Sequence, residues 1–154
     1  MSDGRSEWVG GWHTVRHEVT WRELDAAGHV NNAVYFTYFE WGRTKYWFGL
    51  HGKQEGPFSI GDLGFIVARA ECDFRRQLSL GEAIEIRTRV GEVRRTSFDF
   101  HNQIVRNDGA VAAVGRVVVV RYSWSRGEKI AVEETLRERI VAFQPMESDE
   151  GRER

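Results

Sequence analysis

The segment from residue 32 to residue 50 constrains the fold more than any other part of the chain. Most of its positions are aromatic or aliphatic, and only a few are polar. Asn31 or Asn32 can cap its start, because a short amide side chain accepts a hydrogen bond from the free N–H groups of a first helical turn. Gly49 and Gly52 are placed to end it. The pattern predicts a helix that is apolar on most sides, and such a helix has to be surrounded by the rest of the protein.

Gly42 lies in the middle of this predicted helix. Glycine at an interior helix position costs about 1 kcal/mol relative to alanine. We expect the compensation to be a close approach of another backbone at this point.

The rest of the chain reads mainly as strands, since apolar and polar residues alternate with a period of two. The predicted strands are 13–21, 64–76, 83–93, 96–106 and 110–124. The run Val117–Val120 is apolar on both faces, which predicts cover on the outer face too, with another subunit as one candidate. A short amphipathic helix is expected at about 133–143. In this order the elements predict an α+β domain, with one antiparallel five-stranded sheet wrapped around the helix at 32–50.

The length of 154 residues corresponds to one domain. We expect that domain at 12–144, with a flexible N-terminus at 1–11 and a disordered tail at 145–154. No stretch approaches the roughly 20 apolar residues of a membrane helix, and the polar start does not resemble a signal peptide. With Cys72 as its single cysteine, the chain is expected in a reducing compartment, the cytoplasm.

The charge of the chain is unevenly distributed. The formal net charge is −1, which argues against a nucleic-acid partner. Residues 69–126, however, hold 11 Arg and 7 acids, a net of 11 − 7 = +4. This basic middle is suited to a small anionic ligand. The histidines show no paired spacing with a carboxylate, so we expect no metal site.

One short segment combines a carboxylate with the start of the predicted helix. Asp25 precedes a tight turn at Gly28, and the turn leads directly into Asn31 and Asn32. A helix N-terminus carries roughly +0.5 charge and free N–H groups, which can hold a polarised carbonyl oxygen. Asp25 could then serve as a general base or a nucleophile. On spacing alone the alternative stays open that Asp25 is only a turn or capping residue.

The same segment resembles the signature of the 4-hydroxybenzoyl-CoA thioesterase family of hotdog-fold proteins. The matching residues are Asp25, Gly28, His29, Val30, Asn31, Asn32, Tyr35, Tyr38, Glu40 and Arg43. Later segments that also resemble the family are Asp73–Arg76, Leu80–Glu82 and Arg94–Phe98. The chain departs from the family at Glu23, where many relatives have Asp, and at Gln77, where Pro is frequent.

The resemblance implies a hotdog fold and an acyl-CoA thioesterase that needs no cofactor, since CoA is part of the substrate. It implies that Asp25 is the catalytic carboxylate and that the backbone N–H of Asn32 polarises the thioester carbonyl. The expected substrate-binding residues are Gly28, His29, Asn31, Tyr35, Arg94, Arg95 and Ser97. Arg94 and Arg95 are expected to hold the CoA phosphates, because a guanidinium matches phosphate oxygens.

The resemblance also implies a homodimer or homotetramer with sites at the subunit contacts. Two alternatives stay open at this stage. One is a thioesterase that acts on acyl carrier protein, and the other is a non-catalytic acyl-binding protein of the same fold. Structural roles are equally consistent with several of the candidates, because His29 can orient the turn, Asn31 can cap the helix and Tyr35 can belong to the core.

Overall fold

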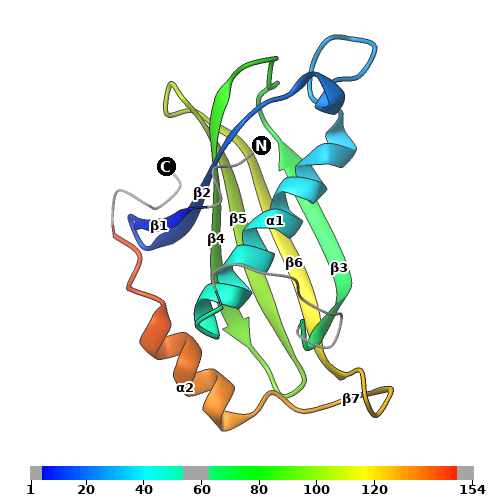
Figure 1. Cartoon of the computed structure of the whole chain (residues 1–154), viewed down its shortest axis with the longest axis vertical. Coiled ribbons are helices and arrows are strands. Elements are labelled where there is room, and N and C mark those ends of the chain that lie inside the picture. Colours follow the sequence, from blue (N-terminus) through cyan, green and yellow to red (C-terminus); the bar gives the residue numbers. More distant parts are fainter. Residues whose placement is uncertain (1–4, 54–62, 149–154) are drawn as a thin grey trace.

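The computed structural model describes residues 5–53 and 63–148, and it places one long helix inside a curved antiparallel sheet (Figure 1). The helices are α1 (Asn32–Leu50), α2 (Glu134–Phe143) and the short 3-10 helix η1 (Trp21–Glu23). The strands are β1 (Ser6–Val9), β2 (Trp12–Glu18), β3 (Phe65–Phe74), β4 (Ala83–Val93), β5 (Ser97–Arg106), β6 (Val111–Ser123) and β7 (Glu128–Lys129). The sheet order is β1-β2-β4-β5-β6-β3, and β7 pairs with β6. This is the predicted α+β hotdog architecture.

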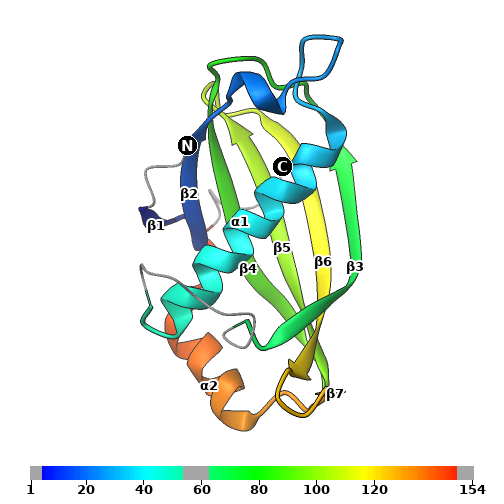
Figure 2. The same cartoon turned by 45° about the vertical axis from the view of Figure 1, so that its right-hand side comes forward.

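Helix α1 crosses the concave side of the sheet, as Figure 2 shows. Its apolar residues pack on the inward-facing side chains of β4, β5 and β6. Among these, Ile86, Phe98, Phe100, Ile104 and Val119 are completely buried. No helix of the described residues is long and apolar enough to cross a membrane.

Gly42 of α1 faces β4 at close range. A Cβ atom at this position would lie 2.3 Å from the Thr88 Oγ1 and 3.0 Å from the Ile86 Cγ2. The close approach predicted at this glycine is present. It is made to side chains of the sheet, however, and not to a second backbone.

The sheet has seven strands where the sequence predicted five. One extra strand, β1, lies within residues 1–11, for which the sequence predicted flexibility. Its residues pair with Trp12–Val15 of β2 across a turn in which Gly10 and Gly11 have positive φ. Glycines occur in flexible segments, but here they form a tight hairpin turn. The other extra strand, β7, is only two residues long.

Two predicted strands differ in detail. The first strand ends at Glu18 and not at residue 21, because η1 follows. In β3 the expected alternation is interrupted: the register shifts between Val67 and Arg69, with Phe65 buried before the shift and Cys72 and Phe74 packed on the core after it. A bulge of this kind changes which face the following side chains occupy. β3 is also the last strand of the sheet order, so one of its edges has no neighbouring strand among the described residues.

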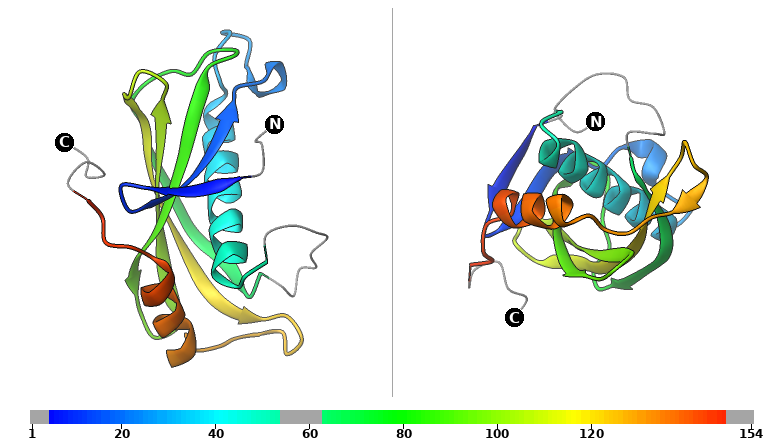
Figure 3. Two further views of the ribbon diagram at one scale, coloured as in Figure 1. Left: turned by 60° about the vertical axis from the view of Figure 1, so that its left-hand side comes forward. Right: turned by 90° about the horizontal axis from the view of Figure 1, so that it is seen from below.

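Helix α2 lies across the end of the domain where β4 turns into β5 (Figure 3). The residue after α2, Gln144, continues the hydrogen bonding of the sheet with its side chain. Its Nε2 donates to the Val90 carbonyl at 2.9 Å, and its Oε1 accepts from the Val90 N–H at 2.7 Å. The same oxygen accepts from the Tyr46 hydroxyl at 2.9 Å. One side chain therefore joins α2, β4 and α1. Residues 149–154 of the expected tail lie outside the described residues.

Candidate active site

The Asp25 turn is a closed loop between η1 and α1. Leu24 and Val30 form an isolated bridge, so residues 25–29 make the turn itself. The Asp25 N–H donates to the His29 carbonyl at 2.8 Å, and the Gly28 N–H donates to the Asp25 carbonyl at 3.0 Å. Gly28 has a φ of 81°, which a residue with a Cβ rarely adopts. Gly28 thus contributes to this site by shaping the turn.

The Asp25 carboxylate is exposed in the single chain. Its Oδ1 accepts a hydrogen bond from the Ala27 N–H at 2.8 Å, which is a local turn contact. The turn role left open by the sequence is therefore present. The second carboxylate oxygen has no hydrogen-bond partner among the described residues, so it is available to a water or a carbonyl carbon.

The first turn of α1 offers a free backbone donor at Asn32. Asn31 is the N-cap, and its Oδ1 accepts from the Ala33 N–H at 3.0 Å. The Val34 N–H donates to the Asn31 carbonyl at 2.9 Å. Within residues 5–53 and 63–148 the Asn32 N–H has no acceptor. A free N–H at the positive end of a helix dipole is suited to a developing oxyanion.

A third segment fixes the position of this loop. The Val30 N–H donates to the Leu78 carbonyl at 2.9 Å, and His29 bridges to Ser79. His29 is therefore held through its main chain, and its side chain is half-buried.

Tyr35 belongs to the core at this end of α1. The side chain is buried, and its hydroxyl donates to the Arg76 carbonyl at 3.0 Å. Its ring packs edge-on to Phe74 at a centroid distance of 5.1 Å. Burial raises the pKa of the phenol to about 12, so the group remains a donor at neutral pH. Tyr35 joins α1 to the end of β3.

Arg94, Arg95 and Ser97 lie far from the Asp25 turn within one chain. They sit at the β4–β5 turn, at the opposite end of the sheet from the start of α1 (Figure 1). Ser97 precedes the buried Phe98 in β5 and so points to the sheet face turned away from α1. The single chain does not bring these three residues together with Asp25.

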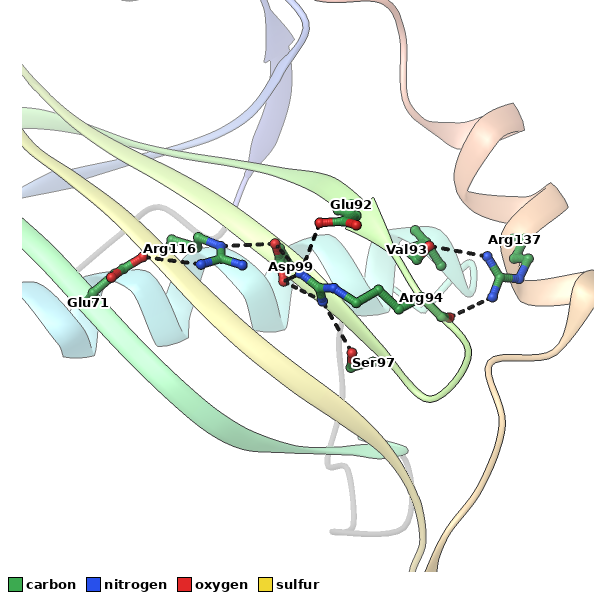
Figure 4. Close-up of polar contacts among 8 residues, drawn as sticks. All are labelled: Glu71, Glu92, Val93, Arg94, Ser97, Asp99, Arg116 and Arg137. Atoms are coloured by element: carbon green, nitrogen blue, oxygen red, sulfur yellow. Dashed lines mark hydrogen bonds and ion pairs between the residues drawn. The ribbon is translucent and has the colours of Figure 1, made fainter.

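Arg94 is already engaged by carboxylates, as Figure 4 shows. Its guanidinium contacts both oxygens of Asp99 at 2.9 Å and also pairs with Glu92 at 3.2 Å. The Asp99 side chain is only 3% exposed, and Arg116 contacts it from the other side at 2.9 Å. Arg95 is exposed, and no ion pair of its guanidinium occurs among the described residues. Of the two arginines, Arg95 is the better placed to meet a phosphate.

Sequence reasoning noted Glu23 only as a departure from the family pattern, yet it is the most connected side chain beside the site. Its Oε1 accepts from the His17 Nε2 at 2.8 Å and from the Tyr38 hydroxyl. Its Oε2 accepts from the N–H of Thr20 at 2.9 Å and from the Thr20 hydroxyl. Burial raises the pKa of this carboxyl, but the hydrogen bonds from Thr20, Tyr38 and His17 outweigh burial and hold the pKa below its usual value. The one sequence signal for a role at the site was the position of Glu23, two residues before Asp25.

A cavity of about 370 Å³ lies elsewhere, between β2, β4 and the β5–β6 turn. The cavity is lined by three arginines, Arg16, Arg87 and Arg106. Each of these arginines pairs with a glutamate. No residue of the Asp25 turn lines this cavity.

Comparison with known proteins points to one group. The sequence profile of the thioesterase-like superfamily matches residues 19–140. A thioesterase from Thermus thermophilus, solved as a complex with coenzyme A and Zn, is 34% identical, with a TM-score of 0.71 over 82% of this chain and 95% of that one. A thioesterase superfamily protein from Jannaschia is 27% identical, with a TM-score of 0.72 over 84% of this chain and 82% of that one. The acyl-CoA thioesterase YbgC of Haemophilus influenzae is 29% identical over 89 residues, which are 58% of this chain and 65% of that protein.

Proposed function

Because the chain belongs to the thioesterase-like superfamily, we propose that it hydrolyses the thioester of an acyl-CoA to a free acid and CoA. The observation that carries the proposal is the Asn32 N–H at the start of α1, which has no acceptor in the described part of the chain and lies beside the turn that presents Asp25. This pair supplies a donor for the carbonyl oxygen and a carboxylate for the carbonyl carbon or its attacking water. The match to YbgC and the bound coenzyme A of the Thermus thermophilus relative support CoA as the carrier.

The reaction follows from these two groups. The thioester carbonyl oxygen accepts a hydrogen bond from Asn32, which stabilises the negative charge that develops on it. Asp25 takes a proton from water as the new C–O bond forms, or attacks the carbon itself to form an anhydride that water then opens. The C–S bond breaks and CoA leaves as a thiolate. Because a thiol has a pKa near 8.5, no strong general acid is required.

We propose that a second copy of the chain completes the site by pairing along β3. Among the described residues one edge of β3 has no neighbouring strand, and Val67 and Phe74 of β3 are each nearly half exposed. Such edges are normally covered. The Phe74 end of β3 contacts Tyr35 near the Asp25 turn, whereas the Phe65 end pairs with Arg121, which in turn bonds to Thr96 in the β4–β5 turn.

Antiparallel pairing of two β3 strands would therefore set the β4–β5 turn of one copy alongside the Asp25 turn of the other. The partner's Arg95 would then face a ligand held at Asp25, although it cannot do so within one chain. The covered site would also shield from bulk solvent a carboxylate that is exposed in the single chain. A dimer fits this proposal directly, and a cytoplasmic location remains a prediction from composition.

The test is hydrolysis of short, long and aromatic acyl-CoAs by the wild type and by Asp25→Asn. We expect the substitution to lower kcat by at least about a hundredfold while leaving the melting temperature nearly unchanged, because Asp25 is exposed. Full activity of Asp25→Asn would refute the proposed role. Much faster turnover of acyl carrier protein substrates would identify a protein carrier, and tight acyl-CoA binding without turnover would identify a binding protein.

A further inference from the structure

We propose that Glu23 is a positioning residue that holds the Asp25 turn against the first turn of α1, so that the carboxylate and the Asn32 N–H act on the same carbonyl. This inference rests on the proposed function. Glu23 is only 9% exposed and is not expected to touch the substrate. It acts through the groups that it joins.

The main chain of Glu23 closes the loop that carries the site. Its carbonyl accepts the Asn31 N–H at 2.9 Å, and its N–H donates to the Thr20 carbonyl at 3.1 Å. Asn31 is the N-cap of α1, and Asn32 is the next residue. The two ends of the Asp25 turn therefore meet at the main chain of Glu23.

The side chain of Glu23 ties this loop to two other elements. His17 belongs to β2 and Tyr38 to α1, and both donate to the same carboxylate oxygen. The His17 ring is held against Tyr38 and Trp41 at centroid distances of 5.5 and 5.0 Å. The carboxylate thus links β2, the Asp25 turn and α1.

The network is built for an ionised carboxylate. Four donors converge on Glu23, and no Arg or Lys is paired with it among the described residues. Because an ionised carboxylate only accepts hydrogen bonds, the Nε2 of His17 has to carry a proton. Burial raises the pKa of Tyr38, and its hydrogen bond to Glu23 raises it further, so the phenol also stays a donor.

Because the fold holds the pKa of Glu23 below its usual value, the network also stabilises the folded chain. This role is separable from positioning, because a variant that still folds can lose stability without losing kcat. Placement acts on the rate directly, since a displacement of about 1 Å at a reacting group can cost about a hundredfold in rate.

The test compares Glu23→Gln and Tyr38→Phe with the wild type, with Glu18→Gln as the matched control. Glu18 is an exposed glutamate at the end of β2. Glu23→Gln keeps the shape of the side chain but offers an NH₂ group to donors. Tyr38→Phe removes one donor and keeps the ring, so it covers the case in which Glu23→Gln does not fold.

For folded Glu23→Gln and Tyr38→Phe we expect kcat to fall by about ten- to a hundredfold, with KM for the acyl-CoA changed less than about twofold. Hydrogen exchange at the Asp25 and Asn31 amides should become faster, while amides of β5 keep the protection of the wild type. Glu18→Gln should match the wild type in all three measurements.

Folded variants with unchanged kcat would refute the positioning role, even if their melting temperatures are lower. An equal loss of kcat and of protection throughout the sheet would also refute it, since that is the result of a general structural defect. The proposed function is tested separately in the same assay by the wild type and Asp25→Asn. If the wild type and Asp25→Asn hydrolyse acyl-CoA at the same rate, the proposed function is refuted, whatever the Glu23 variants show.

Discussion

Replacement of Gly42 by alanine tests whether the contact between α1 and β4 is as close as the structure shows. The new Cβ atom would lie 2.3 Å from the Thr88 Oγ1 and 3.0 Å from the Ile86 Cγ2. Thr88 is fully buried and cannot simply rotate away, because its Oγ1 accepts from the Asn102 Nδ2 at 2.9 Å. The added methyl group must therefore displace the helix or break a buried hydrogen bond.

The expected cost follows from three contributions. Overpacking a core costs about 1–3 kcal/mol, and loss of a buried hydrogen bond about 1 kcal/mol. Alanine regains about 1 kcal/mol over glycine in helix propensity. We expect Gly42→Ala to lower the free energy of unfolding by about 1–3 kcal/mol, and the melting temperature by about 2–4 °C for each kcal/mol.

Urea unfolding followed by circular dichroism measures this change. Thr88→Ala provides the critical background, because it removes the oxygen that the new methyl group would meet. In that background we expect Gly42→Ala to cost about half as much, a coupling of about 0.5–1.5 kcal/mol. A neutral or stabilising Gly42→Ala in the wild type, or costs that simply add, would refute the reasoning.

Two further predictions concern charge. Arg95→Ala should raise KM for an acyl-CoA by about tenfold and leave KM unchanged for a small thioester of the same acid, as steady-state kinetics can show. The exposed Arg126→Ala is the control, and equal effects of Arg95→Ala on both substrates would contradict phosphate binding. Burial, followed by the charge of Lys45, lowers the pKa of His13 to about 4. The fold therefore favours neutral His13. Its contribution to the free energy of unfolding is fully present above pH 6.5. This contribution is lost as the pH drops from 6.5 toward 4, which lowers the free energy of unfolding by on the order of 3 kcal/mol in total. The melting temperature of His13→Phe should vary less over this range, and an unchanged pH profile would contradict the assignment.

The architecture was largely predictable because its strongest signals are local. The apolar segment at 32–50 forms α1 with the predicted bounds, and the alternating segments form β4, β5 and β6 within one residue. β1 was missed because Gly10 and Gly11 occur both in flexible segments and in tight hairpin turns. The inner face of β3 could be predicted only after its bulge, where Cys72 and Phe74 pack on the core. Before the bulge Phe65 is buried, and a bulge depends on how the strand pairs, which its own residues do not reveal.

In the candidate site, too, relations between residues close in sequence were predictable and contacts across the sheet were not. The Asp25 turn and the start of α1 adjoin in sequence, so their proximity could be inferred from the motif. The engagement of Arg94 with Asp99 could not, since it depends on which face of the sheet each strand residue occupies. Within residues 69–126, Arg87, Arg94 and Arg116 each pair with a carboxylate of the same segment. The sequence showed the net charge of the segment but not which of its arginines are engaged in this way.

The bonds made by Gln144 have a consequence for synthesis of the protein on the ribosome. Val90 and Tyr46 are made early, but their shared partner follows 54 and 98 residues later. Until residue 144 emerges, the edge of β4 at Val90 lacks both of these partner groups, and the hydroxyl of Tyr46 lacks its acceptor. The nascent chain can form the α1 segment and individual hairpins. The contacts among α2, β4 and α1, however, form only after Gln144 has been translated. Premature stops before Gln144 should therefore leave β4 open to pairing with other chains.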